Sequence, residues 1–145
     1  VGLPFGAPPS RDELQKKLND KDLYVQRHAK AMLETLDRVG KLPADYPYPI
    51  QVLQLGKDLT LVALAGEVVV DYDIRLKRET GPPEKLWVAA YANDVFAYIA
   101  SKRVIQEGGY EASNSMIYYG QPGPWAPEAE DVLVGKVRQM VRNLR

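Results

Sequence analysis

The sequence of 145 residues contains no cysteine and only one histidine, His28. The lack of cysteine excludes disulfides and thiolate metal sites, and it leaves the cellular compartment open. With a single imidazole, this chain alone cannot form a metal centre or a catalytic triad built mainly on histidine. His28 lies on the apolar stripe of a predicted helix, so we expect a packed side chain there rather than a ligand.

Excess charge of one sign and long apolar runs are also missing. The chain has 19 basic and 19 acidic residues, so its net charge does not predict binding to nucleic acid or to an anionic membrane. No apolar run reaches the length of a transmembrane segment. A phosphate-binding glycine-rich loop and a nucleophile elbow are absent as well. The composition is otherwise typical of a globular protein, and we expect a single domain over residues 1–145.

The ends of the sequence suggest a piece of a longer protein. The chain starts with Val1 rather than methionine, and residues 1–9 are rich in proline and glycine. We expect residues 1–9 to form a linker or loop. For Trp125, in a second proline-rich loop, two roles remain open: a wall of a lipid entrance or a packed corner.

Several helices are indicated by their end signals and apolar spacing. Ser10 and Glu13 form a capping box at the start of a short helix. A second helix is predicted over residues 21–39, where apolar side chains recur at helical spacing before Gly40. Another is predicted to begin at about Pro127 and to run to residue 144.

The central part of the chain predicts a mixed sheet. Residues 59–65 form an unbroken apolar run, which is typical of a strand buried on both faces, and residues 50–55 precede it as the first strand of a hairpin. After Gly66 and Glu67 we expect a helix over residues 68–79 and a third strand over residues 86–92. A strand–helix–strand unit is normally parallel with a right-handed crossover. The predicted fold class is therefore α/β: a hairpin plus a strand–helix–strand unit, covered by helices, as part of a larger α/β hydrolase-type domain.

Polar side chains follow both inner strands. Parallel strands end at the same edge of a sheet, where ligands of α/β proteins bind, so we expect Glu67 to lie near the loop at residues 93–94. A carboxylate and a phenol at this edge could bind a cation or polarise a carbonyl. In the competing interpretation, Glu67 caps the following helix and the tyrosines only pack. The candidates besides Glu67 are Asn93, Asp94, Tyr98, Tyr110 and Glu111.

Three segments in order, within residues 50–124, resemble the neutral/alkaline ceramidase family. They are Gly66-Glu67 with a following basic helix segment, Arg75-Leu-Lys-Arg78; Asn93-Asp-Val-Phe-Ala-Tyr98-Ile; and Tyr110-Glu-Ala-Ser-Asn-Ser-Met-Ile-Tyr-Tyr-Gly120. The family hydrolyses the amide of ceramide to sphingosine and a fatty acid at a zinc ion held by two histidines, a glutamate and a tyrosine. The resemblance implies that Glu67 and Tyr98 are zinc ligands. It also implies that Tyr110 hydrogen-bonds the oxyanion or the attacking group.

The resemblance also has departures. The family's two histidine ligands and active-site serine lie upstream of the matched part, and His28 matches neither histidine. Val68 and Val69 replace the family's threonines, and Phe96 and Ala97 replace small polar residues. The chain would then be the C-terminal part of a catalytic domain and would need the remainder of that domain as its partner.

The resemblance implies a lipid-like N-acyl amide substrate and, if the protein is like the family, a secreted or periplasmic location. We predict that these 145 residues alone are inactive. The alternative is a non-catalytic α/β binding or structural domain that keeps the fold without the chemistry.

Overall fold

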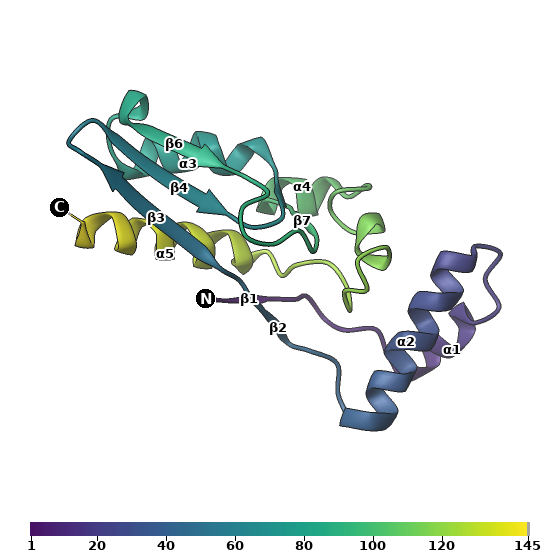
Figure 1. Cartoon of the computed structure of the whole chain (residues 1–145). Coiled ribbons are helices and arrows are strands. Elements are labelled where there is room, and N and C mark those ends of the chain that lie inside the picture. The colour runs from purple at the N-terminus through teal and green to yellow at the C-terminus, as the bar shows by residue number, and fades with distance from the viewer. Residues whose placement is uncertain (145) are drawn as a thin grey trace.

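The computed structural model describes residues 1–144 and shows an α/β fold, as predicted. Its helices are α1 (Arg11–Lys17), α2 (Leu23–Val39), α3 (Val70–Thr80), α4 (Lys102–Glu107) and α5 (Glu128–Asn143), with 3-10 turns at Pro83–Lys85 and Asn114–Ile117. Its strands are β1 (Gly2–Pro4), β2 (Asp45–Pro47), β3 (Ile50–Leu55), β4 (Leu59–Leu64), β5 (Glu67–Val68), β6 (Leu86–Ala89) and β7 (Tyr98–Ile99). Figure 1 shows the three-stranded sheet with a pair of helices projecting from the main body.

The central sheet has the predicted topology, with strand order β3-β4-β6. The hairpin β3–β4 is antiparallel, and β4 pairs with β6 in parallel through the crossover helix α3. The last parallel pair joins Ala63 to Ala89. Strand β6 ends three residues earlier than predicted. Tyr91, in what was expected to be the strand end, has a left-handed backbone with φ of 58°.

Residues 1–144 cover only one face of this sheet, so the expectation of strands buried on both faces is wrong. Val62, Leu64 and Leu86 belong to the main core, which also takes in the buried faces of α3 and α5. The alternate residues point to the other face, where Trp87 is 62% exposed and Leu55 is 54% exposed. An unbroken apolar run predicts two apolar faces, but it does not predict that this chain supplies a layer for each of them.

The first residues are part of the core rather than a linker. Strand β1 pairs antiparallel with β2, and Leu3 is fully buried. The ring of Phe5 stacks on that of Trp125 with centroids 4.5 Å apart. Trp125 is 1% exposed, so it forms a packed corner and not the wall of an entrance. The predicted linker over residues 1–9 is therefore wrong for the segment that forms β1 and for Phe5.

The end signals predicted for three helices are confirmed, while α2 and α3 each begin two residues later than predicted. Ser10 and Glu13 make both hydrogen bonds of the capping box, and Gly40 ends α2 with φ of 81°. The short helix α4 also has a side-chain cap, since Ser101 accepts a hydrogen bond from the Val104 amide. The last helix, α5, begins directly after Pro127.

Helices α1 and α2 form a hairpin with an apolar cluster of its own. Leu14, Ala29, Met32 and Leu42 are its buried members, and the main core is a separate cluster. His28 in α2 is buried, and its Nε2 lies 2.6 Å from the carbonyl oxygen of Gln121. The imidazole thus joins the hairpin to the main body, in line with the packed role expected for it.

No helix in the described part of the chain is long and apolar enough to cross a membrane.

Candidate functional site

Glu67 and Tyr98 are brought together by a short parallel strand pair. Strand β5 leaves the end of β4 through Gly66, and β5 pairs with β7 so that Glu67 and Tyr98 are register partners. Register partners on neighbouring strands project their side chains from the same face of the sheet. The carboxylate and the phenol predicted as metal ligands therefore lie side by side.

The backbone at Gly66 fixes this arrangement. Its amide donates to the carbonyl oxygen of Asp94 at 2.8 Å, and the Glu67 amide donates to that of Ala97 at 2.9 Å. Gly66 has φ of 74°, and a Cβ atom there would lie 2.7 Å from the Ala97 carbonyl oxygen. Only glycine fits this close approach. The expectation that Glu67 lies beside the loop at residues 93–94 is confirmed.

Two phenols interact with the Glu67 carboxylate. Hydrogen bonding to this carboxylate, together with some desolvation and its negative charge, raises the pKa of Tyr98 to about 12. The same hydrogen bonding also raises the pKa of Tyr91. At neutral pH both hydroxyls are therefore protonated donors that face a carboxylate. Tyr91 was not among the sequence candidates, because it lies within the apolar run predicted as a strand over residues 86–92.

Tyr110 joins the same cluster through its ring. Its centroid lies 5.6 Å from that of Tyr98 in an edge-to-face arrangement. The row continues from Tyr110 to Tyr118 at 6.4 Å, and from Tyr118 to Tyr24 of α2 at 5.0 Å. The structure thus brings Glu67, Tyr98 and Tyr110 into one cluster, and about half of the Tyr110 side chain is exposed.

The other candidates have different surroundings. The Asp94 carboxylate accepts a hydrogen bond of 2.8 Å from Tyr46, which supports the loop. Asn93 has a left-handed backbone with φ of 69° in the segment between β6 and β7. Glu111 lies with Glu67 and Tyr98 on a cleft of about 410 Å³, whose other lining residues are Val68, Val69, Val70, Arg103, Val104, Glu107 and Gly108. This cleft is the hollow next to the predicted ligands.

Buried polar side chains hold the two site strands from behind. Tyr48 donates to the carbonyl oxygen of Ala65 at 2.6 Å. Gln121 donates to that of Phe96 at 3.0 Å, and the Trp125 indole donates to that of Tyr98 at 2.7 Å. Sequence reasoning missed all three residues, because their hydrogen bonds span 17 to 27 positions and no local pattern encodes them.

The donor set suits part of a zinc site. Carboxylate oxygen is an ordinary zinc ligand, and a phenol beside it adds a second oxygen donor. In the described residues no group of three or more histidine, cysteine, aspartate or glutamate side chains converges as a metal site. The Nε2 atom of His28 is already hydrogen-bonded to the carbonyl oxygen of Gln121. This chain therefore offers two oxygen donors, and the nitrogen ligands of a zinc site would have to come from elsewhere.

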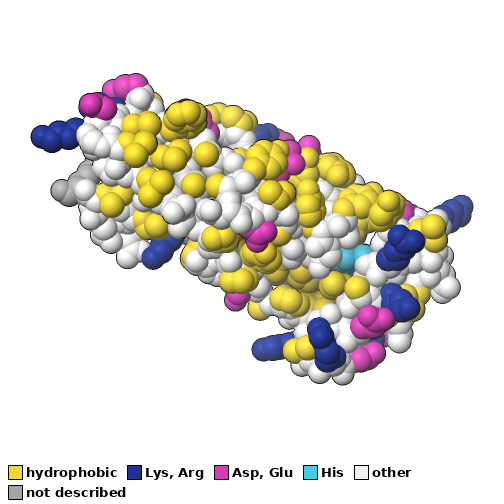
Figure 2. Space-filling view, in the orientation of Figure 1, with side chains coloured by type: hydrophobic (Ala, Val, Ile, Leu, Met, Phe, Trp, Pro, Cys, Tyr) yellow, Lys and Arg dark blue, Asp and Glu magenta, His cyan; other side chains and the backbone are white. Residues whose placement is uncertain are grey.

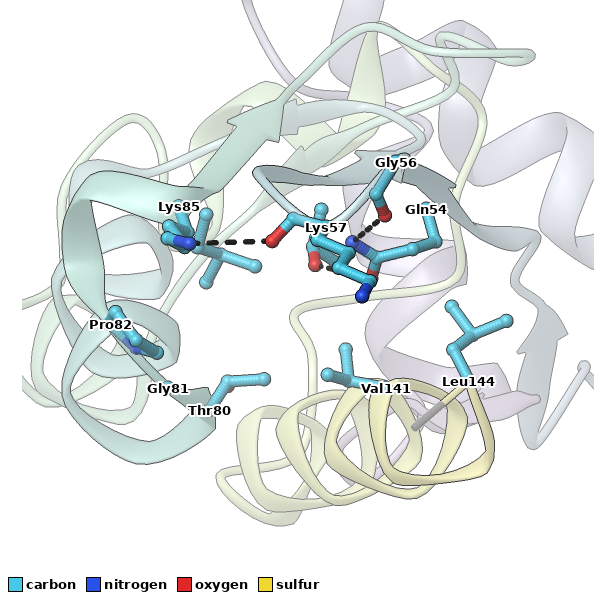
Figure 3. A pocket seen from close by; sticks show the side chains of 11 residues that line it. Gln54, Gly56, Lys57, Thr80, Gly81, Pro82, Lys85, Val141 and Leu144 are labelled. Atoms are coloured by element: carbon cyan, nitrogen blue, oxygen red, sulfur yellow. Dashed lines mark hydrogen bonds between the residues drawn. The ribbon is translucent and has the colours of Figure 1, made fainter.

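A second cleft, of about 420 Å³, lies at the other end of the sheet (Figure 3). Thr80, Gly81 and Pro82 face Val141 of α5 and Leu144, the residue after this helix, across it, with the β3–β4 turn above. The charged side chains among its described lining residues are Lys57 and Lys85, and the Lys85 ammonium already contacts Asp58 at 3.3 Å. No carboxylate and phenol meet there, so the Glu67 cleft is the better candidate site.

No protein-family model, curated protein or solved structure matches this chain. The structure itself describes an α/β domain with a carboxylate and a phenol paired on two short strands. Because nothing matches, the family resemblance stays a prediction.

Proposed function

We propose that this chain is the C-terminal part of the catalytic domain of a zinc-dependent amidohydrolase resembling neutral ceramidase. The observation that carries the proposal is the register pairing of Glu67 with Tyr98. These two residues are 31 positions apart in the sequence, and the family resemblance alone implies that both are zinc ligands. Their side-by-side position is what a shared metal ion requires.

Each residue has a distinct role in this proposal. Glu67 and Tyr98 would hold the zinc ion, together with two imidazoles from the remainder of the catalytic domain. The zinc ion would supply a lowered pKa for a water molecule and polarisation of the amide carbonyl. Tyr110 donates a hydrogen bond to the oxygen that becomes negatively charged during attack on the amide carbon. The Tyr91 amide donates to the carbonyl oxygen of Gly66 at 2.9 Å, and its phenol, whose pKa is raised by the Glu67 carboxylate, would orient that carboxylate.

The row of tyrosine rings supports a substrate with an apolar portion. Tyr110 and Tyr118 are each about half exposed, and both continue outward from Tyr98 towards Tyr24 of α2. Aromatic faces of this kind can bind an acyl chain, while their hydroxyls stay in water. A lipid-like N-acyl amide such as ceramide is therefore the proposed substrate class.

The test is metal analysis of the complete polypeptide that contains this chain. Replacing Glu67 with Gln, or Tyr98 with Phe, should lower zinc content and amidase activity together. Glu111→Gln and Tyr118→Phe are matched controls, because they remove the same groups from the same region and should leave zinc content unchanged. The isolated 145 residues should show no turnover of a short-chain ceramide.

Unchanged zinc content in both Glu67→Gln and Tyr98→Phe would contradict the ligand assignment. It would favour the alternative, a binding or structural α/β domain. Amidase turnover by the isolated chain would contradict the need for further ligands.

A further inference from the structure

The uncovered face of the central sheet is uncharged and, apart from Gln51, apolar. It is formed by alternate residues of β3, β4 and β6, which we call the open face: Gln51, Leu53, Leu55, Leu59, Leu61, Ala63, Trp87 and Ala89. No charged residue occurs in any of the three strands. Figure 2 shows hydrophobic side chains gathered over this part of the molecule, in the orientation of Figure 1.

The open face exposes large side chains that normally pack. Trp87 is 62% exposed, Leu55 is 54% exposed and Leu53 is 42% exposed. Through the strand register, Leu53, Leu61 and Trp87 form one row across the sheet. Contiguous apolar surface of this kind marks an interaction site, whereas single exposed apolar residues do not.

The size of the open face argues against a second copy of this chain as its partner. Three strands about 4.8 Å apart, with up to six residues at about 3.3 Å each, cover roughly 15 by 20 Å. A stable dimer buries about 800 Å² on each partner, which is more than this face provides. A layer of the same polypeptide needs less area, because it does not lose the translational freedom of a separate molecule.

The open face also leads to the candidate site. Its row nearest the site ends in Ala63 and Ala89, which are small enough to let a covering layer approach closely. Beyond this row the chain continues to Glu67 on one strand and to Tyr91 on the other, and the Tyr91 amide donates to the carbonyl oxygen of Gly66 at 2.9 Å. A layer over the open face would therefore end beside Glu67 and Tyr98, where nitrogen ligands are needed.

We propose that the open face is an intradomain interface. Its partner is an apolar, uncharged layer from the remainder of the same catalytic domain, and this layer brings the imidazole ligands to Glu67 and Tyr98. The inference rests on the proposed function, which requires those imidazoles. It adds the surface on which the two parts of the domain meet, with the Leu53–Leu61–Trp87 row at its centre.

The accessibility of Trp87 tests the proposal. The chain has two tryptophans, and Trp125 is buried, so 5-fluorotryptophan labelling gives an exposed and a buried signal. The Trp87 signal is identified by its loss in Trp87→Phe. A neutral gadolinium chelate should broaden it strongly in the 145-residue chain and severalfold less in the complete polypeptide. Equal broadening in both would overturn the proposal.

Self-association gives a second independent outcome. The isolated chain should sediment as a monomer at micromolar concentration. A dimer that Leu61→Asp converts to monomer would overturn the proposal and make a second copy the partner.

Zinc analysis separates this proposal from the proposed function. Zinc loss in Glu67→Gln with an accessible Trp87 would overturn only the interface. A shielded Trp87 with zinc content unaffected by Glu67→Gln would overturn the function, and with it the part of the inference that concerns imidazoles.

Discussion

The indole Nε1 of Trp125 donates a hydrogen bond of 2.7 Å to the carbonyl oxygen of Tyr98. The same ring stacks on Phe5, which follows β1. One buried side chain thus ties the start of the chain and the loop before α5 to the strand that carries a proposed zinc ligand. The position of Tyr98 therefore depends on residues far from it in the sequence.

Trp125→Phe is expected to keep an aromatic ring against Phe5 but to remove the donor to Tyr98. The free energy of unfolding should fall by about 1–3 kcal/mol, because a buried carbonyl loses its partner and a smaller ring leaves space. Urea denaturation followed by circular dichroism measures this change. Trp87→Phe, at an exposed position, should stay within about 0.5 kcal/mol of the parent. Equal stability of the two variants would show that the hydrogen bond contributes little.

Gly66→Ala is expected to destabilise the fold and to disturb Glu67. A left-handed backbone with a Cβ costs about 1–2 kcal/mol, and the contact with the Ala97 carbonyl oxygen adds to this. Gly56→Ala is a matched control, since Gly56 has φ of 61° but no atom within 4 Å of the added Cβ. Gly66→Ala should therefore lower the midpoint of thermal unfolding clearly more than Gly56→Ala. Equal shifts would mean that the clash is relieved at no cost.

His28 is expected to make stability depend on pH. Burial lowers the pKa of its imidazole below the ordinary value of 6.5, outweighing the hydrogen bond to Gln121. Because Nε2 donates to a carbonyl, protonation would add a buried Nδ1–H donor, and Nδ1 has no hydrogen-bond partner within residues 1–144. The unfolded chain then binds the proton more readily than the folded protein, so stability falls as the pH drops below about 6.5.

Urea denaturation of the parent and His28→Gln at pH 7.5 and pH 5.5 measures this dependence. The parent should lose more stability than the variant over this interval, which lies above the range in which most carboxylates titrate. Lys17 is the charged group with a resolved effect on His28, and it acts in the same direction as burial. Parallel losses in both proteins would contradict the role of His28.

Arg75 is expected to stabilise the packing of α3 on α5. Its guanidinium contacts Glu79 at 3.0 Å, Glu130 at 2.7 Å and Asp131 at 2.6 Å, and its side chain is 24% exposed. Arg75→Met should lower the free energy of unfolding by about 1–3 kcal/mol, because three carboxylates lose their shared cation. Arg11→Met, which removes the exposed ion pair with Asp37, should cost less than about 1 kcal/mol. Similar losses in chemical denaturation would show that the network adds nothing beyond a surface pair.

The sequence was sufficient for the order of the elements in the sheet. Apolar runs, helix caps and the hairpin turn are local signals, and the handedness of a strand–helix–strand unit follows from them. This reasoning also predicted that Glu67 would meet the loop at residues 93–94, which the hydrogen bond from Gly66 to Asp94 confirms. It did not predict which face of the central sheet would be covered, because that depends on packing against segments that are far apart in the sequence.

The support of the site could not be predicted in the same way. Trp125, Gln121 and Tyr48 each donate to a carbonyl oxygen of a segment that is distant in sequence, and a buried donor of this kind has no neighbours in sequence that reveal it. Tyr91 was missed because it lies within the strand predicted over residues 86–92. Its left-handed backbone ends that strand early and leaves its phenol near Glu67.

The buried apolar side chains of residues 1–144 fall into two clusters of unequal size, the smaller one formed by the α1–α2 hairpin and Leu42. The smaller cluster has few buried side chains, and Tyr24 with His28 provides its link to the main body. Local opening of a small unit needs less free energy than global unfolding. Amide protons of α2 are therefore expected to exchange with solvent deuterium sooner than those of β4. Because Tyr24 is the last ring of the row that starts at Tyr98, the same opening would expose Tyr118 and widen access to the cluster around Glu67 while the sheet stays folded.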